Sequence, residues 1–268
     1  MRITSPDNPL VRRLRRLAES ARACRDAGRT LAEGVHVIEA ALDAGVAIVT
    51  LVLRGGVSPA VEALVARLEA ADSHGRVKRV VLAPALYDAL SPVEHGAGVL
   101  AEIEIPPAPD WTALSVDAVY LDGVQDPGNV GTLLRTAAAA GVRRVIVGPG
   151  TAYAWSPKVM RAAMGAHFVL HIAEGVAAAD AARGFEGTVL AADVGGEDLY
   201  AAEWGRAPTL WLFGSEGQGL SPDAAAVAQR RLRIPLATGV ESLNVAAAAA
   251  VCLFEQARRR RAGRSGAP

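Results

Sequence analysis

The chain has 268 residues, of which 51% are hydrophobic and 21% charged, and its formal net charge is zero. This length allows a large apolar core and favours two domains over one. The zero net charge excludes a global field that attracts nucleic acid, and Cys24 and Cys252 match neither a disulfide framework nor a metal-binding spacing.

Basic residues nevertheless gather at both ends of the chain. Residues 1–30 hold eight arginines against three acidic side chains, and residues 255–268 hold five arginines against one. Solvated tails are the usual explanation, but two such ends favour a polyanionic partner. The sequence contains neither an N-terminal apolar run of signal-peptide length nor a stretch able to span a bilayer, so we expect a cytoplasmic protein.

The first part of the chain, residues 1–106, is predicted to be a small α/β domain. Its first helix is expected over residues 5–25, with Ser5 or Asp7 as the cap. Four arginines surround the apolar stripe of this helix: Arg12, Arg13, Arg15 and Arg16. Helices and strands then alternate over residues 35–44, 48–53, 59–71, 77–82, 84–90 and 98–105. A proline-rich stretch predicts a linker over 107–116.

The second part, residues 117–268, alternates apolar strands with helices. Strands are expected at 118–122, 144–147, 169–172, 189–192, 210–213 and 232–235, and helices at 132–140, 157–166, 223–229 and from 245 onward. Cys252 falls in the last helix, at a core position. This order implies a parallel sheet with helices on both faces, and ligand loops in such sheets lie at the carboxyl ends of the strands.

The first of three loops at strand ends contains Asn129, Gly131 and Arg135. The glycine lets backbone approach a ligand closely. Taken alone, Asn129 has the chemistry of a helix cap. Arg135 lies in the first turns of a mostly apolar helix and needs a partner, which is either an internal carboxylate or an external phosphate.

The second loop, residues 214–219, contains three glycines and Glu216. It matches neither the P-loop pattern nor the dinucleotide fingerprint, and Glu216 would repel a phosphate. A carboxylate among glycines suits a ligand that carries hydroxyl groups or positive charge. Alternatively, Glu216 orients Arg135.

The third loop follows a strand that ends at Pro235 and precedes a helix that opens with a run of alanines. Either Ser242 or Asn244 is suited to cap that helix. Backbone groups beside a helix N-terminus bind small polar ligands well. On its own, however, this stretch is an ordinary strand–loop–helix corner.

Taken together, the three loops resemble the three motifs of the SpoU (TrmH) group of SPOUT RNA ribose methyltransferases. The resemblance covers residues 117–257 and rests on Asn129 and Arg135, then on the sequence 213–219, then on Ile234-Pro235 and Ser242-Leu243-Asn244. Many members have glycine where this chain has Thr238. Residues 30–34 and 98–101 make the first part similar to the L30e-like RNA-binding domain that often precedes this catalytic domain.

The resemblance implies a C-terminal parallel-sheet domain with a deep trefoil knot. It also implies S-adenosylmethionine as the cofactor, a homodimer formed through the catalytic domain, and transfer of a methyl group to a ribose 2′-hydroxyl of structured RNA, with 23S rRNA favoured. The expected cofactor-binding residues are Gly214, Ile234 and Leu243. The implied catalytic residues are Asn129, Arg135, Glu216, Ser242 and Asn244. RNA contacts are expected from Arg12, Arg13, Arg15, Arg16 and Arg135.

The chemistry is compatible with these roles. The ribose hydroxyl must be held in line with the methyl group and must lose its proton. Because arginine is very hard to deprotonate, we expect Arg135 to position the RNA and stabilise charge rather than to act as the base. Asn129, Glu216 and Asn244 would hold Arg135 and the hydroxyl in place, and Ser242 is either a cap or a catalytic contact.

Three other functions remain as alternatives. The protein could methylate tRNA instead of rRNA, or it could be an RNA-binding protein whose methylase half has decayed. The intact set of motif residues argues against decay. A nucleotide-dependent oxidoreductase is the third alternative, and the missing dinucleotide fingerprint argues against it.

Overall fold

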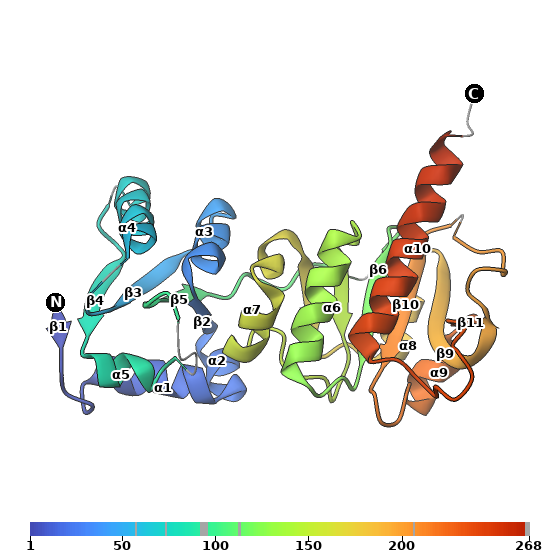
Figure 1. Cartoon of the computed structure of the whole chain (residues 1–268), viewed down its shortest axis with the longest axis horizontal. Coiled ribbons are helices and arrows are strands. Elements are labelled where there is room, and N and C mark those ends of the chain that lie inside the picture. Colours follow the sequence, from blue (N-terminus) through green and yellow to red (C-terminus); the bar gives the residue numbers. More distant parts are fainter. Residues whose placement is uncertain (57, 73, 92–95, 112–113, 206, 266–268) are drawn as a thin grey trace. The chain divides into compact units, whose positions relative to one another are not determined.

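The computed structural model describes residues 1–56, 58–72, 74–91, 96–111, 114–205 and 207–265 (Figure 1). Residues 112 and 113 of the expected linker, and residues 266–268, lie outside this description. The chain forms two compact units, of which the first is Met1–Pro107 with Trp155–Phe168 and the second is Ala108–Ala154 with Val169–Pro268. The expected domain ranges had placed 155–168 with the second part of the chain.

The first unit is built on a five-stranded sheet with the order β1-β4-β3-β5-β2. Its strands are β1 (Arg2–Ile3), β2 (Arg29–Glu33), β3 (Ile48–Arg54), β4 (Lys78–Leu82) and β5 (Val99–Glu104). Its helices are α1 (Pro9–Glu19), α2 (Ala21–Ala27), α3 (Val35–Asp43), α4 (Pro59–Ala71), α5 (Pro84–Asp88) and α7 (Pro157–Ala163). Strand β5 pairs antiparallel with β2 and β3, whereas the other pairs are parallel.

The prediction of a single helix over residues 5–25 is wrong, because two helices, α1 and α2, occupy this range. Ser20 leaves the helical conformation, ends α1, and caps α2 by accepting a hydrogen bond from the backbone N–H of Ala23 at 3.1 Å. The cap of α1 is Asn8, rather than Ser5 or Asp7, because its Oδ1 accepts the N–H of Leu10 at 2.9 Å and Pro9 follows at the first helical position. A serine with its own cap hydrogen bond thus divides one apolar pattern into two helices.

A buried carboxylate fixes α1 on the sheet. The side chain of Glu102 on β5 is fully buried, and it accepts hydrogen bonds from Arg13 at 2.8 Å, Arg29 at 3.3 Å and the hydroxyl of Thr50 at 2.9 Å. A buried charge is tolerated only when it is paired and hydrogen-bonded. Arg13 is therefore part of the internal structure of the first unit, in contrast to its neighbour Arg12, which is exposed.

The segment Trp155–Phe168 packs within the first unit, where α7 contacts β2. Arg161 forms an ion pair with Glu33 at 2.9 Å, and the hydroxyl of Thr30 donates to the carbonyl oxygen of Trp155 at 2.6 Å. The ring of Trp155 also lies 4.9 Å from that of His167, measured between centroids. Strand β2 thus holds this segment through one ion pair and one buried hydrogen bond.

The second unit contains a six-stranded, wholly parallel sheet with the order β11-β9-β10-β6-β7-β8. Its strands are β6 (Ala118–Asp122), β7 (Arg144–Val147), β8 (His171–Glu174), β9 (Thr188–Asp198), β10 (Thr209–Gly214) and β11 (Arg230–Arg233). Its helices are α6 (Pro127–Ala139), α8 (Ala178–Arg183), α9 (Pro222–Val227) and α10 (Val245–Ser265). The predicted α/β class and parallel sheet are confirmed, and the trefoil knot stays a prediction.

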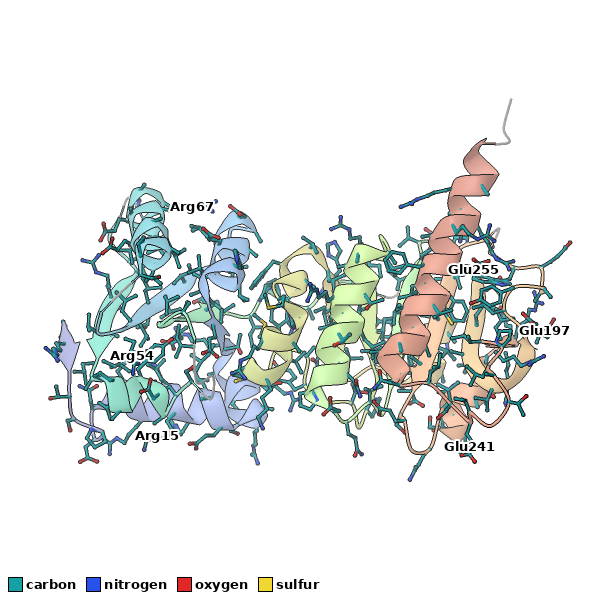
Figure 2. The ribbon with its side chains drawn as sticks, in the orientation of Figure 1. Arg15, Arg54, Arg67, Glu197, Glu241 and Glu255 are labelled. Carbon is teal, nitrogen blue, oxygen red and sulfur yellow. The ribbon has the colours of Figure 1, made fainter. Side chains whose placement is uncertain are left out.

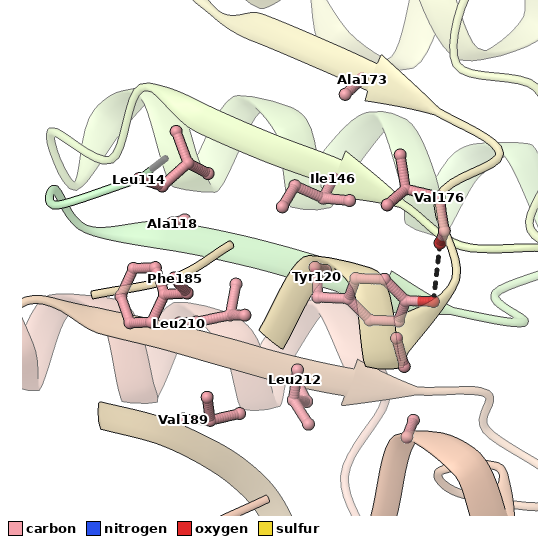
Figure 3. Packing of buried hydrophobic residues seen from close by; sticks show 13 residues of the cluster. Leu114, Ala118, Tyr120, Ile146, Ala173, Val176, Phe185, Val189, Leu210 and Leu212 are labelled. Carbon is pink, nitrogen blue, oxygen red and sulfur yellow. Dashed lines mark hydrogen bonds between the residues drawn. The ribbon is translucent and has the colours of Figure 1, made fainter. Parts of the chain in front are cut away.

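One face of this sheet forms an apolar core against short helices (Figure 3). The core cluster includes Tyr120 of β6, Ile146 of β7, and Leu210 and Leu212 of β10, together with alanines of α8 and α9. The hydroxyl of Tyr120 donates to the carbonyl oxygen of Val176 at 3.0 Å, and desolvation raises the pKa of this phenol to about 12. Tyr120 therefore stays neutral and acts as a core residue.

Helix α10 packs on α6 and on strands β9 and β10. Its Cys252 is buried, as predicted, and burial raises the pKa of the thiol to about 12. Among the residues described, no helix combines the length and apolar character needed to cross a membrane.

Candidate active site

The loops that carry the three motifs follow β6, β10 and β11, whose carboxyl ends share one edge of the parallel sheet. A cavity of about 490 Å³ lies at this edge. Residues from the middle of β9, from the ends of β10 and β11 with the loops that follow them, and from the start of α10 line it. Its volume is in the range of small-molecule sites.

A chain of side-chain hydrogen bonds links the three motifs. The Nδ2 of Asn129 on α6 donates to Oε1 of Glu216, and the Nδ2 of Asn244 donates to Oδ1 of Asn129 at 3.0 Å. The Oδ1 of Asn244 accepts the backbone N–H groups of Ala246 at 3.0 Å and Ala247 at 3.3 Å. Asn244, rather than Ser242, therefore caps α10.

The capping bonds fix the direction of the whole chain of hydrogen bonds. Backbone N–H groups only donate, so the oxygen of Asn244 must face α10 and its NH₂ group must face Asn129. The NH₂ group of Asn129 is then directed at Glu216, which as an ionised carboxylate only accepts. Each of these polar atoms has a partner of the right kind, and this orients the Glu216 carboxylate from one side.

The interpretation of Asn129 as a helix cap is wrong. Helix α6 begins at Pro127, five residues before the predicted start, and its cap is Asp126, whose Oδ1 accepts the N–H of Asn129 at 2.8 Å. Because Asn129 lies inside the first turn and another residue serves as the cap, its side chain is available for Glu216 and Asn244.

Arg135 lies on the exposed side of α6. Within the described parts of the chain, its guanidinium makes no hydrogen bond or ion pair. The alternative in which Glu216 orients Arg135 is therefore not observed, since the contact of Glu216 is with Asn129. Of the two partners considered for Arg135, an external anion is the one compatible with this geometry.

The second motif forms a tight hairpin at the end of β10. Ser215 and Gly219 exchange backbone hydrogen bonds of 3.0 and 2.9 Å. A Cβ at Gly214 would collide with the carbonyl group of Gly219, so a side chain at position 214 would open the hairpin. Glycine is required at position 214 because the backbone of Gly219 lies against it. Both glycines line the cavity, so this close contact forms part of the cavity wall.

The three residues expected to bind the cofactor, Gly214, Ile234 and Leu243, all line the cavity, and so do Glu216 and Ser242. Asn129, Arg135 and Asn244 are not part of its lining. The geometry thus separates a cavity formed by the second and third motifs from the exposed arginine of the first.

Sequence reasoning missed two lining residues that form an ion pair. The carboxylate of Asp193 on β9 lies 3.2 Å from the guanidinium of Arg231 on β11. Asp193 also accepts a hydrogen bond from the backbone N–H of Gly195 at 2.8 Å. The available signal was the position of Asp193 immediately after the expected strand 189–192. Glu241, in the third motif, is a further lining residue that was not singled out.

This lining fits S-adenosylmethionine. Phe213, Ile234, Leu236 and Leu243 offer apolar surface for a nucleobase, and the hairpin offers backbone groups for hydrogen bonds. The carboxylates Asp193, Glu216 and Glu241 suit hydroxyl groups and a positively charged ligand. No cluster of metal-binding side chains was found in the described parts of the chain.

In the first unit, an open groove of about 480 Å³ on the surface of α1 is lined by Pro9, Arg12, Arg13, Arg15 and Arg16. Arg12 and Arg16 are exposed and Arg15 is half-buried, whereas Arg13 is engaged with Glu102. The structure therefore keeps three of the four arginines available for an external partner.

Comparison with known proteins gives consistent matches. The SpoU rRNA Methylase family matches residues 118–254, and the MRM3-like substrate binding domain matches residues 8–101. An uncharacterized tRNA/rRNA methyltransferase of Synechocystis sp. is 33% identical over 263 residues, which cover 96% of this chain and 93% of that protein. The 23S rRNA (guanosine-2′-O-)-methyltransferase RlmB of Pseudomonas syringae is 35% identical over 188 residues, 62% of this chain and 72% of that protein.

A solved structure extends the similarity to nearly the whole length of the chain. The SpoU methyltransferase AviRb from Streptomyces viridochromogenes, in complex with the cofactor AdoMet, has a TM-score of 0.83 and 27% identity, and covers 95% of this chain and 98% of that one. The parallel sheet, the linked motif loops and these matches lead to the same conclusion. The chain belongs to the SpoU rRNA methylase family.

Proposed function

We propose that the protein transfers a methyl group from S-adenosylmethionine to a ribose 2′-hydroxyl of structured RNA, with 23S rRNA as the substrate. The hydrogen-bonded chain Asn244–Asn129–Glu216 carries this proposal, because it joins all three motifs beside a cavity of cofactor size. The family membership and the relative RlmB, a 23S rRNA (guanosine-2′-O-)-methyltransferase, support the reaction and the RNA class.

Gly214, Ile234 and Leu243 are proposed to hold the cofactor, because they line the cavity. The cofactor supplies an electrophilic methyl group on a sulfonium. The hairpin at 215–219 keeps one wall of the site fixed, and Glu216 enters the cavity with its orientation set by Asn129. A preorganised carboxylate of this kind needs no rearrangement when the substrate binds.

Arg135 is proposed to act on the RNA side. Its guanidinium has no partner among the described residues and is suited to a phosphate next to the target ribose, and the bidentate geometry of such a pair would hold the 2′-hydroxyl in line. Ser242 is exposed, lines the cavity and is not the helix cap, so its hydroxyl is left for contact with the acceptor or the cofactor.

The first unit is proposed to bind the RNA outside the reaction centre. The match to an MRM3-like substrate binding domain and the arginine-lined groove on α1 support this role. Each phosphate contact contributes to affinity without reading sequence, so this unit would supply binding strength that depends on salt.

A homodimer formed through the second unit, in the cytoplasm, completes the proposal. Two large apolar side chains of the second unit, Val240 and Phe254, are exposed and lie outside the cavity lining. Burial of these side chains in a dimer interface would remove their apolar surface from water.

Transfer of a tritiated methyl group from S-adenosylmethionine tests the function. Transcripts of 23S rRNA should accept the methyl group, and a transcript with a 2′-deoxy target nucleotide should not. Transfer that persists on the deoxy substrate would identify a base methyltransferase. Preference for a tRNA pool over rRNA would support the tRNA alternative, and no transfer to either RNA would support the inactive RNA-binding protein.

A further inference from the structure

The negative and positive charges of the side chains that line the cavity do not cancel. Among the described residues, they comprise the carboxylates of Asp193, Glu216 and Glu241 against the single guanidinium of Arg231. Asp193 is paired with Arg231 at 3.2 Å and with the N–H of Gly195. Glu216 accepts a hydrogen bond from the neutral amide of Asn129, which orients the carboxylate but does not cancel its charge.

Glu241 differs from the other two carboxylates. It is exposed in the loop between β11 and α10 (Figure 2), next to Ser242 and Leu243 in the cavity lining. Among the residues that the structure describes, none forms a hydrogen bond or ion pair with its side chain. Its charge is therefore available to whatever occupies the cavity.

The proposed reaction changes the charge of the occupant. The S–CH₃ bond breaks with its electron pair left on sulfur, an O–CH₃ bond forms, and the proton of the 2′-hydroxyl passes to solvent water. The sulfonium cofactor thus becomes an uncharged thioether, S-adenosylhomocysteine. The amino and carboxyl groups of the methionine part are the same before and after transfer, so the sulfonium is the whole difference in charge.

On this basis, which rests on the proposed function, we propose that Glu241 is a specificity residue that favours the cationic cofactor over the neutral product. An unpaired carboxylate attracts the sulfonium and has no such attraction for the thioether. The product is then held less strongly relative to incoming cofactor, and exchange after transfer is favoured. If Glu241 were only a solvated surface residue, its charge would not change the ratio of the affinities for the two ligands.

Calorimetric titration of the full-length protein with S-adenosylmethionine and with S-adenosylhomocysteine measures this preference. Glu241→Gln keeps the shape of the side chain and removes the charge. It should weaken S-adenosylmethionine binding by about two- to fivefold, the range of an exposed ion pair, and leave S-adenosylhomocysteine unchanged. Glu241→Lys should shift the ratio of the two dissociation constants further in the same direction.

Asp223→Asn is the matched control, because Asp223 is an exposed carboxylate of the same unit that is not part of the cavity lining. It should alter neither affinity. The effect of Glu241→Gln should also shrink as salt is raised from about 50 to about 500 mM, because exposed charges are screened (Debye length about 10 Å at 0.1 M). Circular dichroism and the melting temperature of each variant confirm that it is folded.

The outcomes separate the two proposals. If Glu241→Gln weakens both ligands equally, Glu241 shapes the loop and the charge preference is overturned. If neither affinity changes, the residue is a solvated surface glutamate and the inference fails in the same way. If the unsubstituted protein binds neither ligand, the proposed function itself fails.

Discussion

The side-chain amide of Asn129 donates a hydrogen bond to the carboxylate of Glu216, although 87 positions separate the two residues in the sequence. Asn129 in turn accepts from Asn244, which caps α10. The start of one helix thereby sets the orientation of a carboxylate on a different loop. A change at any of the three residues should therefore disturb the other two.

Replacing Asn129 should impair methyl transfer more than cofactor binding, since Asn129 is not in the cavity lining. Asn129→Ala removes the donor to Glu216, and we expect the turnover number to fall by more than about tenfold. Asn129→Asp should be worse, because it sets a second carboxylate against Glu216, and its activity should recover partly as pH is lowered and the pair takes up a proton. Single-turnover assays across pH check both variants. Thr132→Ala, on the same helix, is the control and should retain activity.

Arg135→Ala should still bind S-adenosylmethionine with unchanged affinity. Its turnover should fall by about 10²- to 10³-fold, the effect of removing one preorganised catalytic contact. Arg135→Lys should recover only part of the rate, because lysine lacks the planar fork that pairs with phosphate. Calorimetry with the cofactor and methyl-transfer kinetics test the two parts separately. A loss of cofactor affinity in Arg135→Ala would place this residue in the cofactor site instead.

The three arginines of α1 that are not engaged with Glu102 should contribute to RNA affinity. The triple variant Arg12→Ala, Arg15→Ala, Arg16→Ala should weaken RNA binding and lower its salt slope by roughly one unit for each phosphate that is no longer bound. Filter binding at several salt concentrations measures both, and cofactor affinity should not change. Unaltered RNA affinity would make α1 a solvated face.

Arg13 requires a separate test, because it pairs with the buried Glu102. Arg13→Ala should lower the free energy of unfolding by about 3 kcal/mol, since loss of one partner leaves a buried carboxylate with less compensation. Thermal melting compares Arg13→Ala with the triple variant of Arg12, Arg15 and Arg16, whose stability should be close to that of the unsubstituted protein. Equal stability of Arg13→Ala and the unsubstituted protein would contradict the importance of this pair.

Glu255 on α10 should make the second unit sensitive to acid. Hydrogen bonds from Arg258 and then Arg259 lower the pKa of this carboxyl to about 2, and Arg259 also donates to the carbonyl oxygens of Leu199 and Ala202 at 2.8 Å. Because the folded pKa is depressed, the stabilisation is complete above the unfolded pKa of about 4.3 and is lost as pH falls from there towards 2.

The matching experiment compares the unsubstituted protein with Glu255→Gln. At about pH 7 the variant should unfold at a lower temperature, with a loss of about 1–3 kcal/mol for the charged hydrogen bonds. The difference between the two melting temperatures should narrow as pH falls below about 4.3. A difference that stays constant down to about pH 2.5 would show that the charge of Glu255 makes no contribution.

Light scattering should give the mass of a dimer. Phe254 is 50% exposed on α10, and burial of its ring in an interface would remove apolar surface from water. Phe254→Glu should shift the equilibrium to the monomer. Met164→Glu, at a residue of the first unit that is 49% exposed, is the control and should leave the dimer intact. A monomer mass for the unsubstituted protein at micromolar concentration would refute the assembly.

Local chemistry explains most of what sequence alone could predict in the fold. Apolar runs such as 118–122 and 210–213 are strands β6 and β10, because a wholly parallel sheet buries both faces of its strands. Helix α4 has its predicted bounds, with Ser58 as the cap and Pro59 at the first position. The spacing of the three motifs identified the family, which the matches confirm.

Contacts between distant residues decided the rest. Strand β2 was not predicted, because the pairing of Arg29–Glu33 with β5 is what makes that segment extended. The segment Trp155–Phe168 belongs to the first unit through Glu33 and Thr30. Neither fact has a local signal, since both depend on partners more than 60 positions away.

The site divides in the same way. Its residue types and the order of its loops are determined by the sequence, whose three motifs contain Asn129, Arg135, Glu216, Ser242 and Asn244. Only the tertiary structure decided that Asn244 and Asp126 are the caps, that Glu216 binds Asn129 rather than Arg135, and that Asp193 pairs with Arg231. Side chains with similar hydrogen-bonding chemistry compete for each of these partners, and the positions of the strands determine which of them are within reach.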